Sequence, residues 1–187
     1  MRRPPTFPIL PSAAGSALSA FVASLLLAAL LGAPLAARGD ALSDADLLLR
    51  AGRTEQANES VDAYLAKNPH DMQARFLKGL ILTEQKRENE AIEVFLRLTQ
   101  DNPEYAEPYN NLAVLYAAKG NLEGARRALE TAVRVNPKYT TAQENLGDVY
   151  ARLAVAAYER AAALGSGKEV RTKLKLSREL VAAGADR

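Results

Sequence analysis

Few side chains in this chain of 187 residues are suited to catalysis or metal binding. There is no cysteine, and the single histidine, His70, stands beside Asp71 in an Asn-Pro-His-Asp segment that is typical of a loop. A zinc site needs several Cys, His or carboxylate ligands that converge, and the sequence contains no such cluster. No serine lies in a nucleophile-elbow context, and residues 165–168 lack the preceding strand and the spacing of a phosphate-binding loop. We therefore predict no catalytic residue, no metal site and no cofactor.

Two asparagines, in contrast, occupy equivalent sequence contexts. Asn111 and Asn145 each precede a leucine and lie 34 residues apart. An asparagine amide donates and accepts hydrogen bonds at the same time, so this pair would hold the backbone of an extended peptide if both side chains were free of local partners. The alternative is that Asn before Leu is simply frequent at this point of a repeated unit. A different possibility is a pair of carboxylates that meet in a groove of the fold, an arrangement that suits glycan hydrolysis.

The spacing of 34 residues runs through the whole chain. Asn-Pro pairs end at Pro69, Pro103 and Pro137. Other positions keep this period: the alanines Ala57, Ala91 and Ala125, the large residues Val61, Phe95 and Leu129, the small residues Gly79, Ala113 and Gly147, and the large residues Leu82, Tyr116 and Tyr150. With turn signals at Gly52 and Gly120, each copy is predicted to be helix, turn, helix and Asn-Pro exit. Small residues let two helices approach, and stacked copies bury a continuous core.

On these landmarks the chain resembles the tetratricopeptide repeat family. The third copy fits the family pattern best, with Tyr109, Leu112, Ala113, Tyr116, Ala125, Leu129, Ala132 and Pro137 in place. The resemblance implies an all-α fold, a right-handed α-solenoid of helix-turn-helix repeats over residues 38–164. The repeats would span residues 38–71, 72–105, 106–139 and 140–164.

The fourth copy departs from this pattern. Ala125 lies nine positions after Tyr116, but the matching Ala154 lies only four positions after Tyr150, so five residues are missing where the turn belongs. We predict that both helices of this copy are fused into one long helix from about Gln143 to Leu164. Residues 165–187 would then add a solvated C-terminal capping helix, with a basic patch for anionic lipid or an acidic partner as the alternative.

The resemblance also implies where a partner binds, because the first helix of each repeat lines the concave face in this family. The partner is another protein or a peptide, and the predicted contacts are Phe76, Leu80, Thr83, Asn110, Asn111, Val114, Glu144, Asn145 and Asp148. Leu77, Ala117 and Arg152 fall on the same face. The matching positions at which some relatives hold a C-terminal carboxylate carry no basic residue here, so a carboxylate clamp is not expected.

The first 37 residues form a separate segment. Arg2 and Arg3 precede a stretch without charge from Ala13 to Ala33, and small residues follow. This pattern predicts a signal peptide that is cleaved near Ala36 or Ala37, and an uncleaved inner-membrane anchor is the alternative. Without this segment the chain has 22 Lys and Arg against 22 Asp and Glu, so its charge indicates no nucleic-acid partner. The Ala, Leu and Arg richness and the signal segment together suggest the periplasm of a Gram-negative bacterium.

These observations favour a non-catalytic binding module that acts as a scaffold or an assembly helper in the bacterial envelope. A membrane-anchored structural adaptor is a second hypothesis. A glycan-active enzyme that uses groove carboxylates is a third.

Overall fold

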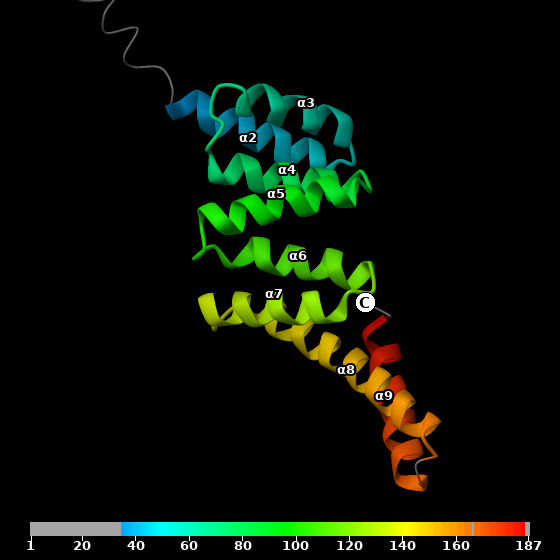
Figure 1. The fold of residues 1–187 in the computed structure, drawn as a ribbon. Coiled ribbons are helices and arrows are strands. Elements are labelled where there is room, and N and C mark those ends of the chain that lie inside the picture. Colours follow the sequence, from blue (N-terminus) through cyan, green and yellow to red (C-terminus); the bar gives the residue numbers. More distant parts are fainter. Residues whose placement is uncertain (1–34, 166, 186–187) are drawn as a thin grey trace, which may run out of the picture. The chain divides into compact units, whose positions relative to one another are not determined.

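The computed structural model describes residues 35–165 and 167–185, and these residues form helices without a strand. The chain divides into two compact units, Met1–Ala41 and Leu42–Arg187. In the first unit the described residues belong to the start of α2, and the second unit holds the rest of the helices (Figure 1). The helices are α2 (Leu35–Arg50), α3 (Thr54–Leu65), α4 (Met72–Glu84), α5 (Glu88–Asp101), α6 (Ala106–Ala118), α7 (Leu122–Val135), α8 (Thr140–Ala163) and α9 (Lys168–Ala185).

The Asn-Pro pairs form the turns between repeats. The backbone carbonyl of each asparagine accepts a hydrogen bond from the N–H three residues later: Asn68 from Asp71, Asn102 from Tyr105 and Asn136 from Tyr139. This is the hydrogen bond of a β-turn, in which proline is favoured at the second position because its φ is already set. The side-chain amides of Asn68 and Asn102 also donate to carbonyls at the end of the preceding helix. The dipeptide therefore ends one repeat and directs the chain into the next.

The turns inside the repeats need a residue with positive φ. Gly52 and Gly120 have φ of 71° and 76°, a conformation that glycine adopts without steric cost. The second repeat has Lys86 at this place, with φ of 60°. Its Cβ crowds the backbone in this left-handed conformation, so the second repeat carries local strain that the first and third do not.

We therefore expect Lys86→Gly to raise the free energy of unfolding by about 1 kcal/mol, because glycine removes the cost of the left-handed conformation. Denaturant titration of both proteins measures the change. Lys67→Gly is the matched control, because Lys67 is also an exposed lysine but is not among the residues with positive φ. If Lys86→Gly were no more stable than the unchanged protein, the inference that Lys86 strains the second repeat would be wrong.

Phe95 is the centre of the packing between the second and third repeats, as the sequence predicts. Its side chain is 0% exposed and lies in a cluster with Leu82, Ala91, Leu112 and Leu115. Gly79 of α4 faces this ring so closely that a Cβ built on it would lie 2.5 Å from the ring atoms Cε1 and Cζ. The prediction that a small residue at this position permits close helix approach is confirmed for Gly79.

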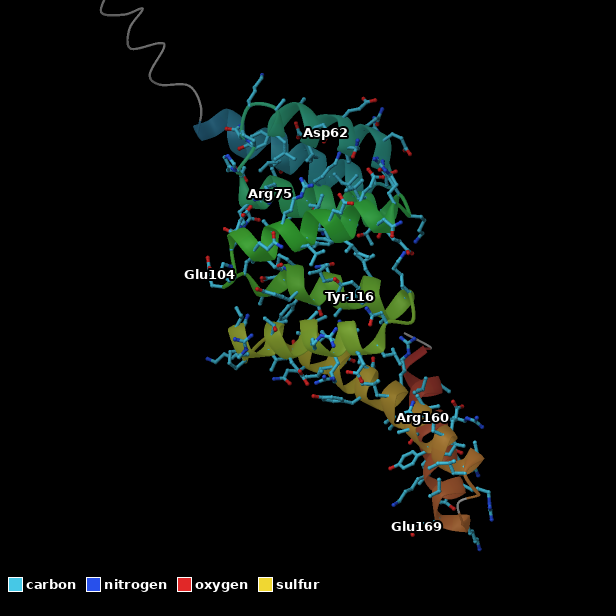
Figure 2. The ribbon with its side chains drawn as sticks, in the orientation of Figure 1. Asp62, Arg75, Glu104, Tyr116, Arg160 and Glu169 are labelled. Carbon is cyan, nitrogen blue, oxygen red and sulfur yellow. The ribbon has the colours of Figure 1, made fainter. Side chains whose placement is uncertain are left out.

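Ion pairs join neighbouring helices on the outside of this core. Lys78 of α4 donates to both carboxylate oxygens of Asp62 on α3, at 2.6 and 2.7 Å. Asp62 and Arg75 are labelled in Figure 2. Arg75, also on α4, pairs with Asp101 at the end of α5 at 2.6 Å. Such pairs at a solvated surface contribute little net stability, so the apolar clusters remain the main source of cohesion.

The fused helix of the fourth copy is confirmed, because α8 runs without a reversal for 24 residues. It begins three residues before the expected Gln143 and ends one residue before Leu164. The capping helix is also present, since α9 packs against α8 and follows its second half (Figure 1). Arg178 of α9 reaches across to Glu159 of α8 at 2.7 Å.

The expectation that Gly147 and Tyr150 serve packing as their counterparts do is wrong. No described atom lies within 4 Å of a Cβ built on Gly147, and Tyr150 is 47% exposed. In the earlier repeats the second helix folds back onto these positions, whereas in α8 it continues along the axis. Tyr150 instead donates a hydrogen bond to Glu130 of α7 at 3.0 Å.

The predicted signal segment lies almost entirely outside the described residues. Of its 37 positions, the structure describes those from Leu35 on, as the start of α2. Within the described part of the chain, no helix is both long and apolar enough to cross a membrane.

Candidate functional site

The predicted binding face contains a cavity between α6 and α8. The first helices of the third and fourth repeats contact each other directly and enclose a volume of about 250 Å³. The cavity is lined by Ala113, Val114, Ala117, Ala118, Leu129, Asn145, Asp148, Val149 and Arg152. Val114, Asn145 and Asp148 were predicted as partner-binding residues, and the structure brings these three together.

Aliphatic side chains form most of the cavity wall. Val114 is 48% exposed, while Ala113, Leu129 and Val149 are buried beneath it. Ala118 and Val149 were not predicted as lining residues, although each lies four positions after one that was, and residues four apart share a helix face. The cavity therefore presents an apolar surface to solvent with polar groups at its border.

The two equivalent asparagines are not free of partners, which corrects the expectation for both. Asn111 donates its amide to the carbonyl of Glu107, one turn earlier in α6, at 2.9 Å. Asn145 donates to the side-chain oxygen of Asn110 at 2.8 Å, across the two repeats. Asn110 is only 7% exposed, so a buried amide oxygen depends on this hydrogen bond. The pair Asn110 and Asn145 thus joins α6 to α8 at the edge of the cavity.

Asn145→Ala is therefore expected to lower the free energy of unfolding by about 1 kcal/mol, because it leaves the Asn110 oxygen without its donor. Asn111→Ala is the matched control: it removes only a bond within one helix, and alanine is the better helix former. Thermal or denaturant unfolding of the two variants measures the difference. Equal stability of both variants would show that the bond between repeats contributes nothing to the fold.

Arg152 serves the fold rather than an open binding face. Its guanidinium donates to the carbonyl of Ala117 at 3.2 Å, in the last turn of α6. Cations are favourable at helix C-termini because the last carbonyls there lack helical partners. Arg152 lines the cavity and, through this hydrogen bond, links α8 to α6.

The predicted contacts of the second repeat lie away from this cavity, on α4. Phe76 and Leu80 are partly buried and pack against the cluster around Phe95, and the rings of Phe76 and Tyr105 are 5.3 Å apart. Thr83 donates its hydroxyl to the carbonyl of Gly79 at 2.9 Å. These side chains contribute to the packing of the repeats, so the groove is less apolar at this end than the sequence indicates.

One acidic residue, Asp148, lines the cavity, and Glu144 precedes it on α8. Glu144 is exposed and Asp148 partly exposed, and they stand one turn apart on the same face of α8.

Burial raises the pKa of Tyr105 to about 12, and the negative charge of Glu107 adds to this rise. The same carboxylate, after burial, raises the pKa of Tyr139. Glu107 of α6 therefore lies near both phenols, close to where α6 and α8 begin.

His70 is an exposed loop residue, as predicted. It borders a separate hollow with Pro69, Arg75 and Arg97. In the part of the chain that the structure describes, no three His, Asp or Glu side chains gather as a metal site would require.

Solved structures of repeat proteins share this fold. The thermophilic TPR protein TTC0263 of Thermus thermophilus is 29% identical, with 74% of this chain and 79% of that chain covered and a TM-score of 0.57. YrrB, described as a TPR protein with an unusual peptide-binding site, is 27% identical, with coverages of 57% and 55% and a TM-score of 0.53. PcrH in complex with the chaperone binding region of PopD is 15% identical, with coverages of 65% and 96% and a TM-score of 0.58, a likeness of fold alone.

One curated protein is also similar over part of its length. It is named a probable biofilm formation methyltransferase, WspC, from Pseudomonas putida, and is 33% identical over 87 residues. The match covers 46% of this chain, and the chain spans only 20% of that protein.

Family models agree with the spacing of the repeats and with the helical hairpins. Two models, both described as tetratricopeptide repeat, match residues 42–106 and 82–153. The second match ends inside α8, in the part of the helix that continues where a turn would otherwise lie. With repeats, hairpins and similar structures in agreement, this chain belongs to the tetratricopeptide repeat family.

Proposed function

We propose that this chain is a non-catalytic protein-interaction module that binds a peptide or a helix in the groove between α6 and α8. The observation that carries the proposal is the cavity of about 250 Å³ with the exposed Val114 on its wall and Asn145 and Asp148 at its border. Apolar pockets with a few well-placed polar groups are the usual form of ligand sites.

Packing holds this groove in shape before a partner arrives. The hydrogen bond between Asn145 and Asn110 and the contact of Arg152 with α6 connect its two walls. A preformed site has a lower ordering cost on binding. Asn145 uses its amide N–H in this bond, and no described residue occupies its side-chain oxygen, which suits it to accept a hydrogen bond from a peptide N–H.

Two similar proteins support a peptide as the occupant. YrrB is described by its peptide-binding site, and PcrH is described in complex with a region of PopD. We extend only the class of partner, a protein segment, to this chain. The residues we assign to the contact are Val114, Asn145 and Asp148, with Glu144 at the rim and Asn110 and Asn111 behind it.

Selection of phage-displayed random peptides on the full chain, followed by titration of a selected peptide, tests the proposal. Val114→Arg fills the cavity with a charged side chain and is expected to weaken binding at least tenfold. Leu176→Arg, at an exposed leucine of α9, is the matched control and should bind as the unchanged protein does. Selected peptides that bind Val114→Arg equally well would show that the groove between α6 and α8 is not the site.

We place this module in the periplasm, on the pattern of residues 1–37. Cell fractionation with N-terminal sequencing tests this, and a soluble protein that begins near Arg38 is the expected result. Recovery of the whole chain in the membrane fraction would favour the anchored adaptor instead.

A further inference from the structure

The C-terminal hairpin, residues 154–185, presents three large apolar side chains to solvent. It consists of the second half of α8 and the whole of α9, which extend beyond α7 (Figure 1). Leu164 at the end of α8 is 88% exposed, and Leu176 and Leu180 of α9 are 58% and 61% exposed. Because Leu176 and Leu180 stand one turn apart, they share one face of α9.

This exposed face is not the side by which α9 packs against α8. Leu174 and Val181 of α9 are partly buried, and Val181 lines a hollow together with Val155 of α8. Leu176 follows Leu174 by two positions, and residues two apart on a helix do not face the same way. The packing of α9 on α8 therefore leaves Leu176 and Leu180 on its outer side.

The same hairpin carries an excess of positive charge. Against its three glutamates stand six basic residues: Arg160, Lys168, Arg171, Lys173, Lys175 and Arg178. Residues 38–153 have the opposite balance, with 15 Lys and Arg against 18 Asp and Glu. The hairpin is thus a positive region on a chain that is otherwise slightly negative.

Ion pairs account for the glutamates and leave the excess of positive charge near the tip. The pairs, at 2.7, 3.7 and 2.7 Å, are Glu169 with Lys173, Glu179 with Lys175, and Glu159 with Arg178. Arg160 and Lys168, four residues before and after Leu164, have no such partner among the described residues. The most exposed leucine of the hairpin therefore lies between two cations in the sequence.

Protruding apolar side chains flanked by lysines and arginines suit the surface of an anionic membrane. The boundary between headgroups and acyl chains accepts the apolar side chains of a helix that lies on the membrane. Anionic headgroups attract the basic residues beside them. A bilayer surface also requires no complementary pocket, which fits leucines that project from the outside of a helix.

We propose that the C-terminal hairpin docks on the surface of membranes that contain anionic phospholipids, without spanning them. Leu164, Leu176 and Leu180 enter the boundary between headgroups and acyl chains, and Arg160 and Lys168 contact the phosphates. None of these five residues lines the cavity between α6 and α8. The proposal therefore goes beyond the peptide-binding function and does not depend on it.

A fluorescent label on the hairpin of the full chain tests the proposal. The chain has no cysteine, so Thr172→Cys at an exposed position of α9 gives a single attachment site for an environment-sensitive fluorophore. Its signal reports on the hairpin and not on residues 1–37. The labelled protein is titrated with vesicles of phosphatidylcholine and phosphatidylglycerol in equal parts, and with vesicles of phosphatidylcholine alone.

The anionic vesicles should shift the emission of this label to the blue and bind at least about tenfold more strongly than the neutral vesicles. Added salt should weaken the binding, because it screens exposed charges. The same fluorophore on Glu93→Cys, at an exposed position of α5, is the control and should show no blue shift.

Two pairs of substitutions then separate the charges from the leucines. Arg160→Gln combined with Lys168→Gln should bind the anionic vesicles severalfold more weakly, whereas Lys138→Gln, at an exposed lysine outside the hairpin, should bind as the unchanged protein does.

Leu176→Ala combined with Leu180→Ala should also weaken the binding severalfold. Its matched control is Leu47→Ala on α2, because Leu47 is 60% exposed. Far-UV circular dichroism and thermal melts establish that each variant is folded, and the charge variant tests the proposal even if the leucine variant does not fold.

Three results would overturn the proposal and leave peptide binding in the groove intact. The first is an equal blue shift on both kinds of vesicle, or none on either. The second is a charge variant that binds the anionic vesicles as tightly as Lys138→Gln does. The third is a blue shift that grows with protein concentration in the absence of vesicles, which would show that a second copy of the chain covers the leucines instead.

Discussion

Phe95→Ala is expected to lower the free energy of unfolding by about 3–5 kcal/mol, the usual range for truncating a buried aromatic side chain. The ring is 0% exposed and belongs to one buried cluster with Leu82 and Ala91 of its own repeat and Leu112 and Leu115 of the next. In stacked repeats each unit is stabilised by its neighbours, so the cavity left by this ring weakens the contact between the second and third repeats.

Denaturant unfolding monitored by circular dichroism measures this loss, and Leu96→Ala on the same helix is the matched control. Leu96 is partly exposed, so its truncation removes far less buried surface. A loss below about 1 kcal/mol for Phe95→Ala would mean that the ring does not hold the repeats together, since truncated core aromatics normally cost several times more. A transition that splits into two steps would show that the halves on either side of the ring unfold separately, as nearest-neighbour coupling allows.

The two equivalent glycines Gly79 and Gly147 should respond in opposite directions to alanine. At Gly79 the new Cβ would lie 2.5 Å from two atoms of the Phe95 ring, and overpacking of this kind typically costs about 1–3 kcal/mol. At Gly147 no described atom lies within 4 Å of the new Cβ. Alanine there improves helix propensity by up to about 1 kcal/mol, so Gly147→Ala should be stabilising.

Each variant serves as the control of the other, because both place alanine at the same repeat position inside a helix. The midpoint of urea unfolding should fall for Gly79→Ala and rise for Gly147→Ala, with unchanged slopes. A loss of stability in both variants would mean that another element covers Gly147. A gain in both would mean that the Phe95 ring moves aside without cost.

The sequence by itself determined the repeat architecture. The recurrence of Asn-Pro and of the small and large apolar positions reports contacts that each repeat makes in the same way, so a period in the sequence becomes a period in the packing. The five missing residues before Ala154 predicted the continuous helix α8, because a reversal of the chain needs residues to form a turn. Gly52 and Gly120 were also predicted as turn residues from the sequence. Lys86 occupies the same place in the second repeat, and its strain is evident only from its backbone angles.

The surroundings of the predicted binding residues were only partly predictable. The family resemblance assigned Val114, Asn145 and Asp148 to the concave face by their matching repeat positions, and the structure gathers them around one cavity. Phe76 and Leu80 follow the same spacing but pack against the core cluster around Phe95. The difference depends on which neighbouring side chains are large enough to cover a position, and helical periodicity does not contain that information.

The tertiary structure alone decided the roles of Gly147, Asn145 and Arg152. Gly147 occupies the same repeat position as Gly79, but no helix covers it. The segment that would fold back over Gly147 instead continues along the axis of the fused helix α8. Asn145 and Arg152 have their partners 35 residues earlier in the chain, at Asn110 and Ala117. Their side chains look free in the sequence because each partner lies in the preceding repeat, and only the packing of α8 against α6 brings the two together.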